Sequence, residues 1–279
     1  MELKLLHYFI EVTKEKSFSV AAEKLYISQP ALSKQIKKLE SMIGFALLTR
    51  SSQGIELTSK GQELYHGIQP HLVQIQRKLE NLKDNVDIRF GATPFLATYY
   101  LPQYYEALAS ENFRITAIKD NGEELTELLE RQEIDAAIVQ DLPSYPGLFS
   151  RFLFDDHFYA AVPTHHPLAQ KMVVSIDECL SETQIIPPSP SPLKNRIQSL
   201  MNQNNIKPEH IIETPYHAII GCVAMNMGVS YFPSIAVKYM QYHGVTFLPL
   251  KDAPLKRSMY LYAVAPDILD QLTNKLSNA

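Results

Sequence analysis

The sequence has few cysteines and no long apolar run. Its two cysteines, Cys179 and Cys222, lack both the paired spacing of a zinc site and the number that a disulfide framework needs. We therefore expect both to be small packing residues, and we expect no metal ion and no other cofactor. No apolar stretch approaches the roughly 18 residues that a membrane-spanning helix requires, so no membrane partner is expected.

The chain also lacks the motifs of the common enzyme classes. It contains no glycine-rich nucleotide-binding loop, no zinc-protease helix and no serine-nucleophile turn. The pair His165-His166 has no neighbouring cysteine or acidic cluster that would complete a metal site. The first residues, Met1 to Lys4, read as the start of an amphipathic helix and not as an export signal. These absences predict a cytoplasmic protein that is not an enzyme.

What is present is an ordinary globular composition with an uneven distribution of charge. The 279 residues suit two or three compact units, and a hydrophobic content of 46% argues against disorder. Residues 1 to 60 hold nine Lys or Arg against six Asp or Glu, a balance of +3. Since the whole chain carries −4, the remainder carries −7. A basic head on an acidic body is typical of a protein whose first segment alone meets phosphates.

Three short helices are predicted in the first 45 residues. Apolar residues at helical spacing from Leu3 to Ile10 indicate the first helix, and a second runs over Ser19 to Leu25. Ser28 is well placed to cap a third helix. Pro30 then falls in the first turn of that helix, where a missing N–H is tolerated.

The third helix has an apolar side and a polar side. Its apolar stripe repeats at about 100° per residue and consists of Leu32, Ile36, Leu39 and Ile43. Its start and opposite side carry the candidate DNA contacts Ser28, Gln29, Pro30, Ser33, Lys34 and Lys37. Gln and Ser can contact base edges, and Lys can bind phosphate or guanine. The alternative is a solvated helix face that merely carries lysines.

A wing and a long helix are predicted next. Residues 47 to 58 form two strand-like halves about a polar turn that contains Gly54. Thr58 then caps a long helix whose apolar residues alternate by four and three, namely Ile68, Leu72, Ile75, Leu79 and Leu82. This spacing predicts a stripe through which two subunits pair.

From residue 87 onward, short apolar runs alternate with helical segments. Such alternation predicts βαβ units and a partly parallel sheet. We expect two α/β lobes, with lobe I at about 87–161 and 265–279 and lobe II at about 162–264. The chain is expected to cross between them near Ala160–Pro163 and Tyr262–Ala265.

The order of these motifs closely resembles the LysR-type transcriptional regulators. The matching segments of the first half are Ser17-Phe18-Ser19-Val20-Ala21-Ala22, Ser28-Gln29-Pro30-Ala31-Leu32-Ser33, Arg50, Gly54 and Leu57-Thr58. Those of the second half are Ile88 to Pro94, Glu133 to Ile138, His166 to Ala169 and Met227 to Val229. Because these segments are spread over both halves, the resemblance covers essentially the whole chain.

The resemblance implies an α/β multidomain fold with three parts. These are a winged helix-turn-helix at 1–58, a dimerising linker helix at 59–86, and an effector domain at 87–279 that is similar to periplasmic solute-binding proteins. It implies a sequence-specific regulator of transcription that binds double-stranded DNA as a homodimer or homotetramer and meets RNA polymerase at promoters. Arg50 matches the wing arginine of the family. Gln53 stands where a second basic residue often follows.

The effector site is expected beyond the carboxyl ends of the strands. From lobe I we place Thr93, Pro94 and Phe95 there, and from lobe II we place Ser189, Ser191, Arg196 and His217. Two serines and a helix N-terminus can hydrogen-bond a carboxylate or another polar anion. The alternative is a rigid loop at the serines, with structural roles for the other two side chains.

Two rival functions differ in what they leave unexplained. An α/β protein can be an enzyme, because fold alone excludes no chemistry. A solute-binding protein for transport would account for the two lobes, but it leaves residues 1 to 58 without a role. A regulator accounts for both parts of the chain.

Overall fold

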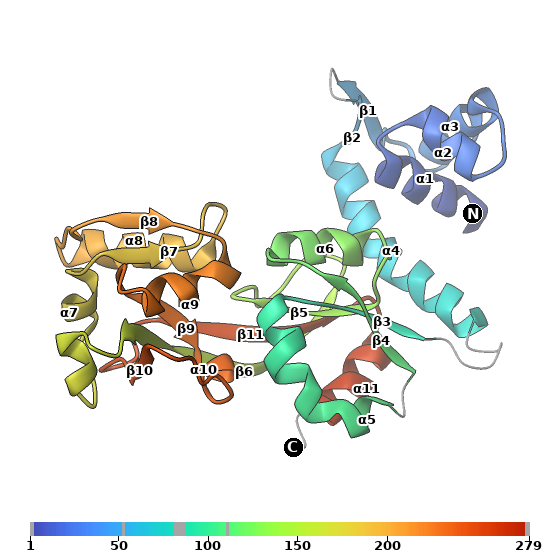
Figure 1. Ribbon diagram of the computed structural model, residues 1–279. Helices are drawn as coiled ribbons and strands as arrows, with labels where there is room; N and C mark the ends of the chain where they lie inside the picture. Colours follow the sequence, from blue (N-terminus) through green and yellow to red (C-terminus); the bar gives the residue numbers. More distant parts are fainter. Residues whose placement is uncertain (1–2, 52–53, 81–86, 110–111, 277–279) are drawn as a thin grey trace.

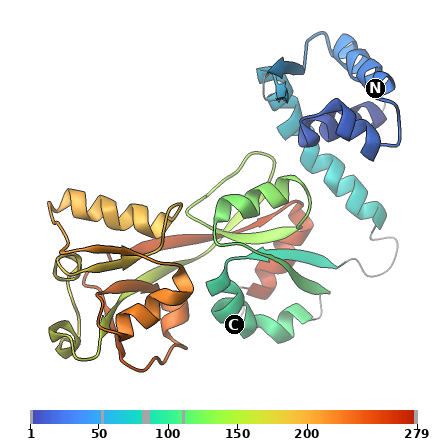
Figure 2. The same ribbon diagram turned by 45° about the horizontal axis from the view of Figure 1, so that its top comes forward.

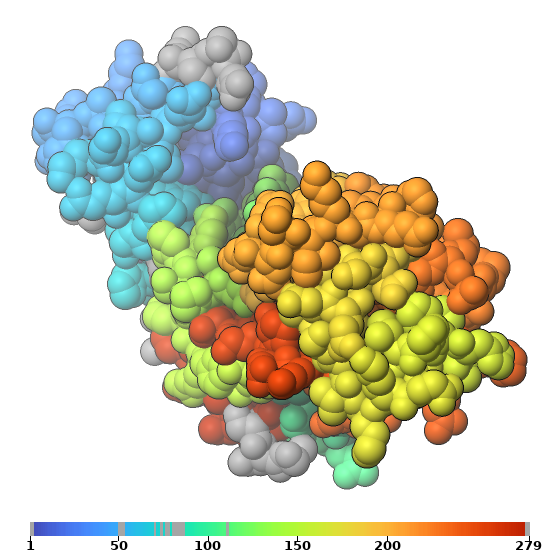
Figure 3. All heavy atoms as spheres, turned by 90° about the vertical axis from the view of Figure 1, so that its left-hand side faces the viewer, coloured from blue at the N-terminus to red at the C-terminus, as the bar shows by residue number. Residues whose placement is uncertain are grey.

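The computed structural model describes residues 3–51, 54–80, 87–109 and 112–276. A small N-terminal head is joined by a linker helix to a larger body of two lobes (Figure 1). The space-filling view shows the head and linker lying against lobe I, with lobe II facing the viewer (Figure 3). Within the described ranges, no helix is both long and apolar enough to cross a membrane.

The head consists of three helices and a two-stranded wing. Its elements are α1 (Leu3–Glu15), α2 (Phe18–Lys24), α3 (Gln29–Ile43), β1 (Leu48–Ser51) and β2 (Gly54–Leu57). Ser28 caps α3 as expected, because its Oγ accepts a hydrogen bond from the Ala31 amide at 3.3 Å. Ala21 and Ala22 are buried, which lets α2 cross its neighbours closely.

Backbone contacts attach the wing to the three-helix core. Gly54 has φ of +116°, and a Cβ there would lie 2.8 Å from the carbonyl oxygen of Lys16, so this position requires glycine. The neighbouring Ile55 amide donates to the same carbonyl at 3.1 Å. The wing is therefore held against the turn between α1 and α2.

The linker helix α4 spans Ser59–Glu80. The Oγ1 of Thr58 accepts a hydrogen bond from the Gly61 amide at 2.9 Å, which confirms Thr58 as its cap. The first half of α4 belongs to the head, because Tyr65 is buried in the core that α1 and α3 form.

The body contains a seven-stranded sheet and a separate pair of strands. The strand order is β10-β6-β11-β5-β3-β4, and β9 pairs with β6. The strands are β3 (Ile88–Ala92), β4 (Phe113–Ile118), β5 (Ala136–Gln140), β6 (Phe149–Pro163), β9 (Ser230–Pro233), β10 (Val245–Pro249) and β11 (Lys256–Ala263). The separate pair is β7 (Gln184–Ile186) with β8 (Ile211–Glu213). β3 runs parallel to β4 and β5, so the sheet is partly parallel, as predicted.

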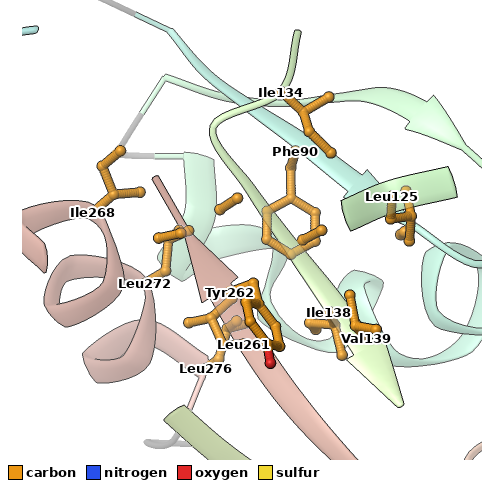
Figure 4. Close-up of a cluster of buried hydrophobic side chains, with 14 of the residues drawn as sticks. Phe90, Leu125, Ile134, Ile138, Val139, Leu261, Tyr262, Ile268, Leu272 and Leu276 are labelled. Carbon is orange, nitrogen blue, oxygen red and sulfur yellow. The ribbon is translucent and has the colours of Figure 1, made fainter. Parts of the chain in front are cut away.

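Helices cover the sheet in both lobes. Lobe I has α5 (Tyr105–Ala109), α6 (Gly122–Glu130), α11 (Pro266–Leu276), a short π-helix η1 (Leu96–Tyr100) and a short 3-10 helix η2 (Leu101–Tyr104). Lobe II has η3 (Pro167–Gln170), α7 (Ile176–Leu180), α8 (Pro192–Gln203), α9 (Tyr216–Ala224) and α10 (Ser234–Val237). The lobe I core brings Phe90, Leu261 and Leu272 together from β3, β11 and α11 (Figure 4).

Two long strands, β6 and β11, join the lobes (Figures 1 and 2). The chain crosses from lobe I to lobe II between Phe154, which packs on the lobe I core, and Phe158, which lies in the lobe II core. It returns between Leu255, in the lobe II core, and Met259, in the lobe I core. The predicted crossings near Ala160–Pro163 and Tyr262–Ala265 were therefore wrong. In the sequence, β11 is a single apolar segment with no mark of where it changes lobe. Its pairing with β5 is what assigns residues 259–263 to lobe I.

Candidate DNA interface and effector cavity

The polar side of α3 faces solvent. Leu32, Ile36 and Leu39 are buried in the head core. The six predicted DNA contacts lie on the other side or at the helix start, where Ser33 is half-buried and Ser28, Gln29, Pro30, Lys34 and Lys37 are exposed. Such a face can enter a major groove, where amide and hydroxyl groups meet base edges and ammonium groups meet phosphates.

The wing presents part of the second predicted contact region. Arg50 lies on β1 opposite Ile55 of β2, at the end of the strand next to the turn. The side chain of Arg50 and the whole of Gln53 lie outside the described residues. The wing backbone stands beside the three helices of the head (Figure 1).

Tyr26, in the turn between α2 and α3, was not singled out by the sequence. Its side chain is 95% exposed, and its φ is +54°. An exposed aromatic residue in the left-handed region is uncommon, because neither packing nor backbone preference favours it there. The signal that could have identified it is its place two residues before the capping residue Ser28, in the turn between the two helices.

The linker stripe divides into two parts. Ile68 and Leu72 pack partly against the core of their own head. Ile75 is 45% exposed and Leu79 is 60% exposed. Leu82 lies outside the described residues. The exposed part of the stripe is thus free to bury itself against another subunit.

A cavity of about 630 Å³ lies between the two lobes. All seven predicted effector residues line it: Thr93, Pro94, Phe95, Ser189, Ser191, Arg196 and His217. The loop after β3 supplies the first three, and the starts of α8 and α9 supply the others. The walls are mainly apolar and aromatic, as in most small-molecule sites.

Thr93 provides an unsatisfied polar group in the cavity wall. Its Oγ1 is buried and has no hydrogen-bond partner within the described part of the chain. A buried hydroxyl without a partner lowers the stability of the fold unless something else pairs with it. A ligand in the cavity would supply that partner.

Phe95 crosses the cavity from lobe I to lobe II. Its ring centroid lies 5.7 Å from that of Tyr216 and 6.2 Å from that of Phe232, both in edge-to-face geometry. Neither Tyr216 nor Phe232 was predicted from the sequence. Tyr216 is the first residue of α9 and Phe232 lies in β9, and an aromatic residue at either place is common in a protein core.

The two predicted serines differ in their surroundings. Ser191 is 3% exposed, and its Oγ caps α8 by accepting from the Lys194 amide at 3.3 Å. Burial raises the pKa of the neighbouring Tyr216 phenol, whereas a hydrogen bond with Ser191 lowers it. Ser189 is exposed at the cavity edge. Ser191 therefore has a structural role already, and Ser189 is the more available donor.

Both arginines that line the cavity are ion-paired. The Arg196 guanidinium lies 2.5 Å from an Asp141 carboxylate oxygen and also donates to the Lys256 carbonyl, so it ties lobe II to lobe I. Arg257 donates to the fully buried Asp156 at 2.8 and 3.0 Å. Sequence reasoning missed the Arg257 pair, because its partners are 101 residues apart.

Three helices of at least nine residues begin at the cavity. They are α6, α8 and α9, whose first residues all line it. Each helix N-terminus carries a partial positive charge and amide groups without partners in the helix. Asn121 and Ser191 cap α6 and α8, whereas no side chain caps α9. This convergence favours a polar or anionic group. Among the described residues, no cluster of three or more His, Cys, Asp or Glu is arranged for a metal ion.

Comparisons with known proteins agree with both halves of this arrangement. Residues 3–62 match the family model "Bacterial regulatory helix-turn-helix protein, lysR family", and residues 85–274 match "LysR substrate binding domain". The regulator BenM of Acinetobacter baylyi is 28% identical over 94% of this chain and 89% of its own length. AlsR of Bacillus subtilis is 30% identical over 85% of this chain and 82% of its own.

Solved structures give the same result for the fold. Full-length OxyR from Pseudomonas aeruginosa superposes with a TM-score of 0.71, at 24% identity, over 100% of this chain and 95% of its own. Full-length BenM superposes with a TM-score of 0.59, at 27% identity, over 99% of this chain and 95% of its own.

A winged head with a polar helix face, joined by one helix to two lobes around a cavity, defines a DNA-binding regulator with a ligand-binding module. The two matched models cover almost the whole chain, and the chain belongs to the LysR family of transcriptional regulators. Members of this family bind DNA, respond to small molecules and form oligomers, and they are not enzymes. The predicted family, fold class and general function are confirmed.

Proposed function

We propose that this regulator holds operator DNA with the polar side of α3 and with the wing, and that a small anionic effector between the lobes alters that binding. The proposed DNA contacts are Ser28, Gln29, Pro30, Ser33, Lys34, Lys37, Arg50 and Gln53. The proposed effector contacts are Thr93, Pro94, Phe95, Ser189, Ser191, Arg196 and His217.

One observation carries the effector assignment. The buried Thr93 hydroxyl, which has no hydrogen-bond partner among the described residues, lies in the wall of a cavity at which three helices begin. Hydroxyl and amide donors suit a carboxylate or another polar anion, and the aromatic walls suit an apolar body. Because both arginines that line the cavity are ion-paired within the protein, uncharged donors and helix dipoles supply the main attraction for the anion, and Arg196 contacts the effector while it stays paired with Asp141.

The oligomer, the compartment and the transcription machinery complete the proposal. The exposed Ile75 and Leu79, together with Leu82, pair α4 with the same helix of a second subunit, in a homodimer or a homotetramer. A DNA-binding regulator of transcription acts in the cytoplasm and meets RNA polymerase at its promoters. The functional units are residues 1–58, 59–86 and 87–279.

Two measurements test the proposal. Fluorescence anisotropy of the full chain against duplexes selected from a random pool should show sequence-specific binding that weakens as salt rises. A thermal-shift panel of small carboxylates and their matched amides should show stabilisation by a carboxylate, since a ligand of the folded state raises its stability. Stabilisation by the amide alone would contradict an anionic effector.

A further inference from the structure

Helix α6 touches both the effector cavity and the linker helix. Its first residues, Gly122 and Glu124, line the cavity together with the capping Asn121. At its other end, the carbonyl oxygen of Glu130 accepts a hydrogen bond from Nε2 of Gln69 at 2.7 Å. The nine residues of α6 span about 13 Å at roughly 1.5 Å each, so one helix covers the distance between the two sites.

The contact between Gln69 and Glu130 is a specific one. Gln69 is 3% exposed although it lies on the linker helix, and it supplies a donor to one of the last carbonyls of α6, which have no partner within the helix. A buried amide side chain that loses such a partner is destabilising. A partly stretched Gln69–Glu130 hydrogen bond would leave the buried Gln69 donor unsatisfied. We therefore expect this hydrogen bond to be either fully formed or fully broken.

The turn after β5 strengthens the same junction. Gly147 has φ of +80°, and a Cβ there would lie 3.4 Å from Oε1 of Gln69 and 3.6 Å from Nδ1 of His66. Burial, with the charge of Glu130 as a further cause, raises the pKa of the Tyr145 phenol to about 12. The same two causes raise the pKa of Tyr65 on α4. Glu130 thus contacts the linker helix through its backbone carbonyl, and the charge of its carboxylate acts on the Tyr65 phenol of the same helix.

The other end of α6 is equally well fixed in lobe I. A Cβ on Gly122 would lie 2.9 Å from Cγ1 of Val139, so α6 begins tightly against β5. Leu125 and Leu129 are fully buried in the lobe I core. A displacement at the cavity end would therefore move α6 together with the lobe I core, and the far end of α6 would move with it.

We propose that Gln69 is the positioning residue that couples the effector cavity to the DNA-binding head. The inference rests on the proposed function, because it assumes an effector at the start of α6. A ligand held there favours one position of α6, the Gln69–Glu130 contact transfers that preference to α4, and α4 carries the head. Only an element with two arrangements that both sites bias can couple them, and we assign that role to the Gln69–Glu130 contact.

Coupling is reciprocal, so DNA can serve as the probe in place of an effector. The experiment measures amide hydrogen exchange of the full chain, with and without a duplex selected from a random pool. In the wild type, bound DNA should change exchange at residues 122–126 by about threefold or more.

The decisive variant is Gln69→Met, which keeps the volume of the side chain and removes the donor. It should bind the duplex within about twofold of the wild type, while the response at α6 disappears. Gln62→Met is the matched control, since Gln62 is exposed on the same helix two turns earlier, and it should respond as the wild type does. If Gln69→Met folds poorly, Gln69→Leu removes the same donor with a slightly smaller apolar side chain.

The outcomes separate this inference from the function on which it rests. A response at α6 that persists in both Gln69 variants overturns the coupling role, as does a wild-type α6 that does not respond to bound DNA. A wild type that binds no duplex at all counts against the proposed DNA contacts instead.

Discussion

Phe95 of lobe I meets Tyr216 of lobe II across the effector cavity, with ring centroids 5.7 Å apart and ring planes at 86°. Such edge-to-face pairs contribute about 1 kcal/mol beyond the area that they bury. This pair holds the two lobes together on one side of the cavity. The Arg257–Asp156 ion pair joins β11 and β6 at the point where these two strands pass from one lobe to the other.

Phe95→Ala should lower the free energy of unfolding by about 2 kcal/mol, because it removes a ring that packs against both lobes. Urea denaturation followed by circular dichroism measures the change. Phe152→Ala is the control, since Phe152 is 51% exposed and its removal should cost much less. Equal losses in the two variants would show that Phe95 adds nothing by bridging the lobes.

Thr93→Val should separate ligand affinity from stability. The substitution removes a buried hydroxyl that has no partner within the described residues, so the unliganded protein should be as stable as the wild type or up to about 1 kcal/mol more stable. The carboxylate found by thermal shift should bind about five- to tenfold more weakly, because one hydrogen bond is lost. Calorimetric titration measures this affinity. Unchanged affinity would remove Thr93 from the effector site.

Lys34→Ala and Lys37→Ala should each weaken DNA binding and reduce the slope of log K against log salt by about 0.9, the value expected for one phosphate contact. Lys207→Ala, an exposed lysine of lobe II, is the control and should leave both quantities unchanged. Gln29→Ala should instead relax sequence preference at nearly the same slope. Anisotropy titrations at several salt concentrations distinguish these effects, and an unaltered slope in both lysine variants would exclude phosphate contacts.

Leu79→Glu should dissociate the subunits without unfolding them. Leu79 is 60% exposed in the isolated chain, so a carboxylate there harms the fold little, but it would be unpaired in an apolar seam between two subunits. Sedimentation velocity should show the monomer in place of the dimer. Leu3→Glu, at a position that is 59% exposed on α1, is the control and should leave the sedimentation coefficient unchanged. A variant at Leu79 that remains fully dimeric would place the interface elsewhere.

Arg257→Met should destabilise the body by about 3 kcal/mol or more, because it leaves the carboxylate of Asp156 buried without its ionic partner. The Ser234 hydroxyl and the Ile235 amide also donate to that carboxylate, and two hydrogen bonds do not replace a full charge. The double variant Arg257→Met with Asp156→Asn should recover part of the loss in urea denaturation. No recovery would indicate that the loss comes from packing against Phe158 and not from charge.

Several features of the chain could be predicted from the sequence because they depend on local interactions. The caps at Ser28 and Thr58 follow from side chains that bond amides three residues later. The polar side of α3 follows from helical spacing alone. The loop after β3 could be assigned to the cavity because ligands in α/β folds lie beyond the carboxyl ends of strands.

The tertiary structure alone decided how distant segments meet. Whether β11 joins lobe I or lobe II depends on its partner strands, since an apolar strand fits either sheet. The partners of Arg257 and Phe95 lie about 100 or more residues away, and spacing in a sequence carries no signal over that range. The linker stripe was chosen by its period, yet Ile68 and Leu72 turn toward their own head. Helical spacing fixes which residues share a face, but only the packed neighbours determine what that face touches.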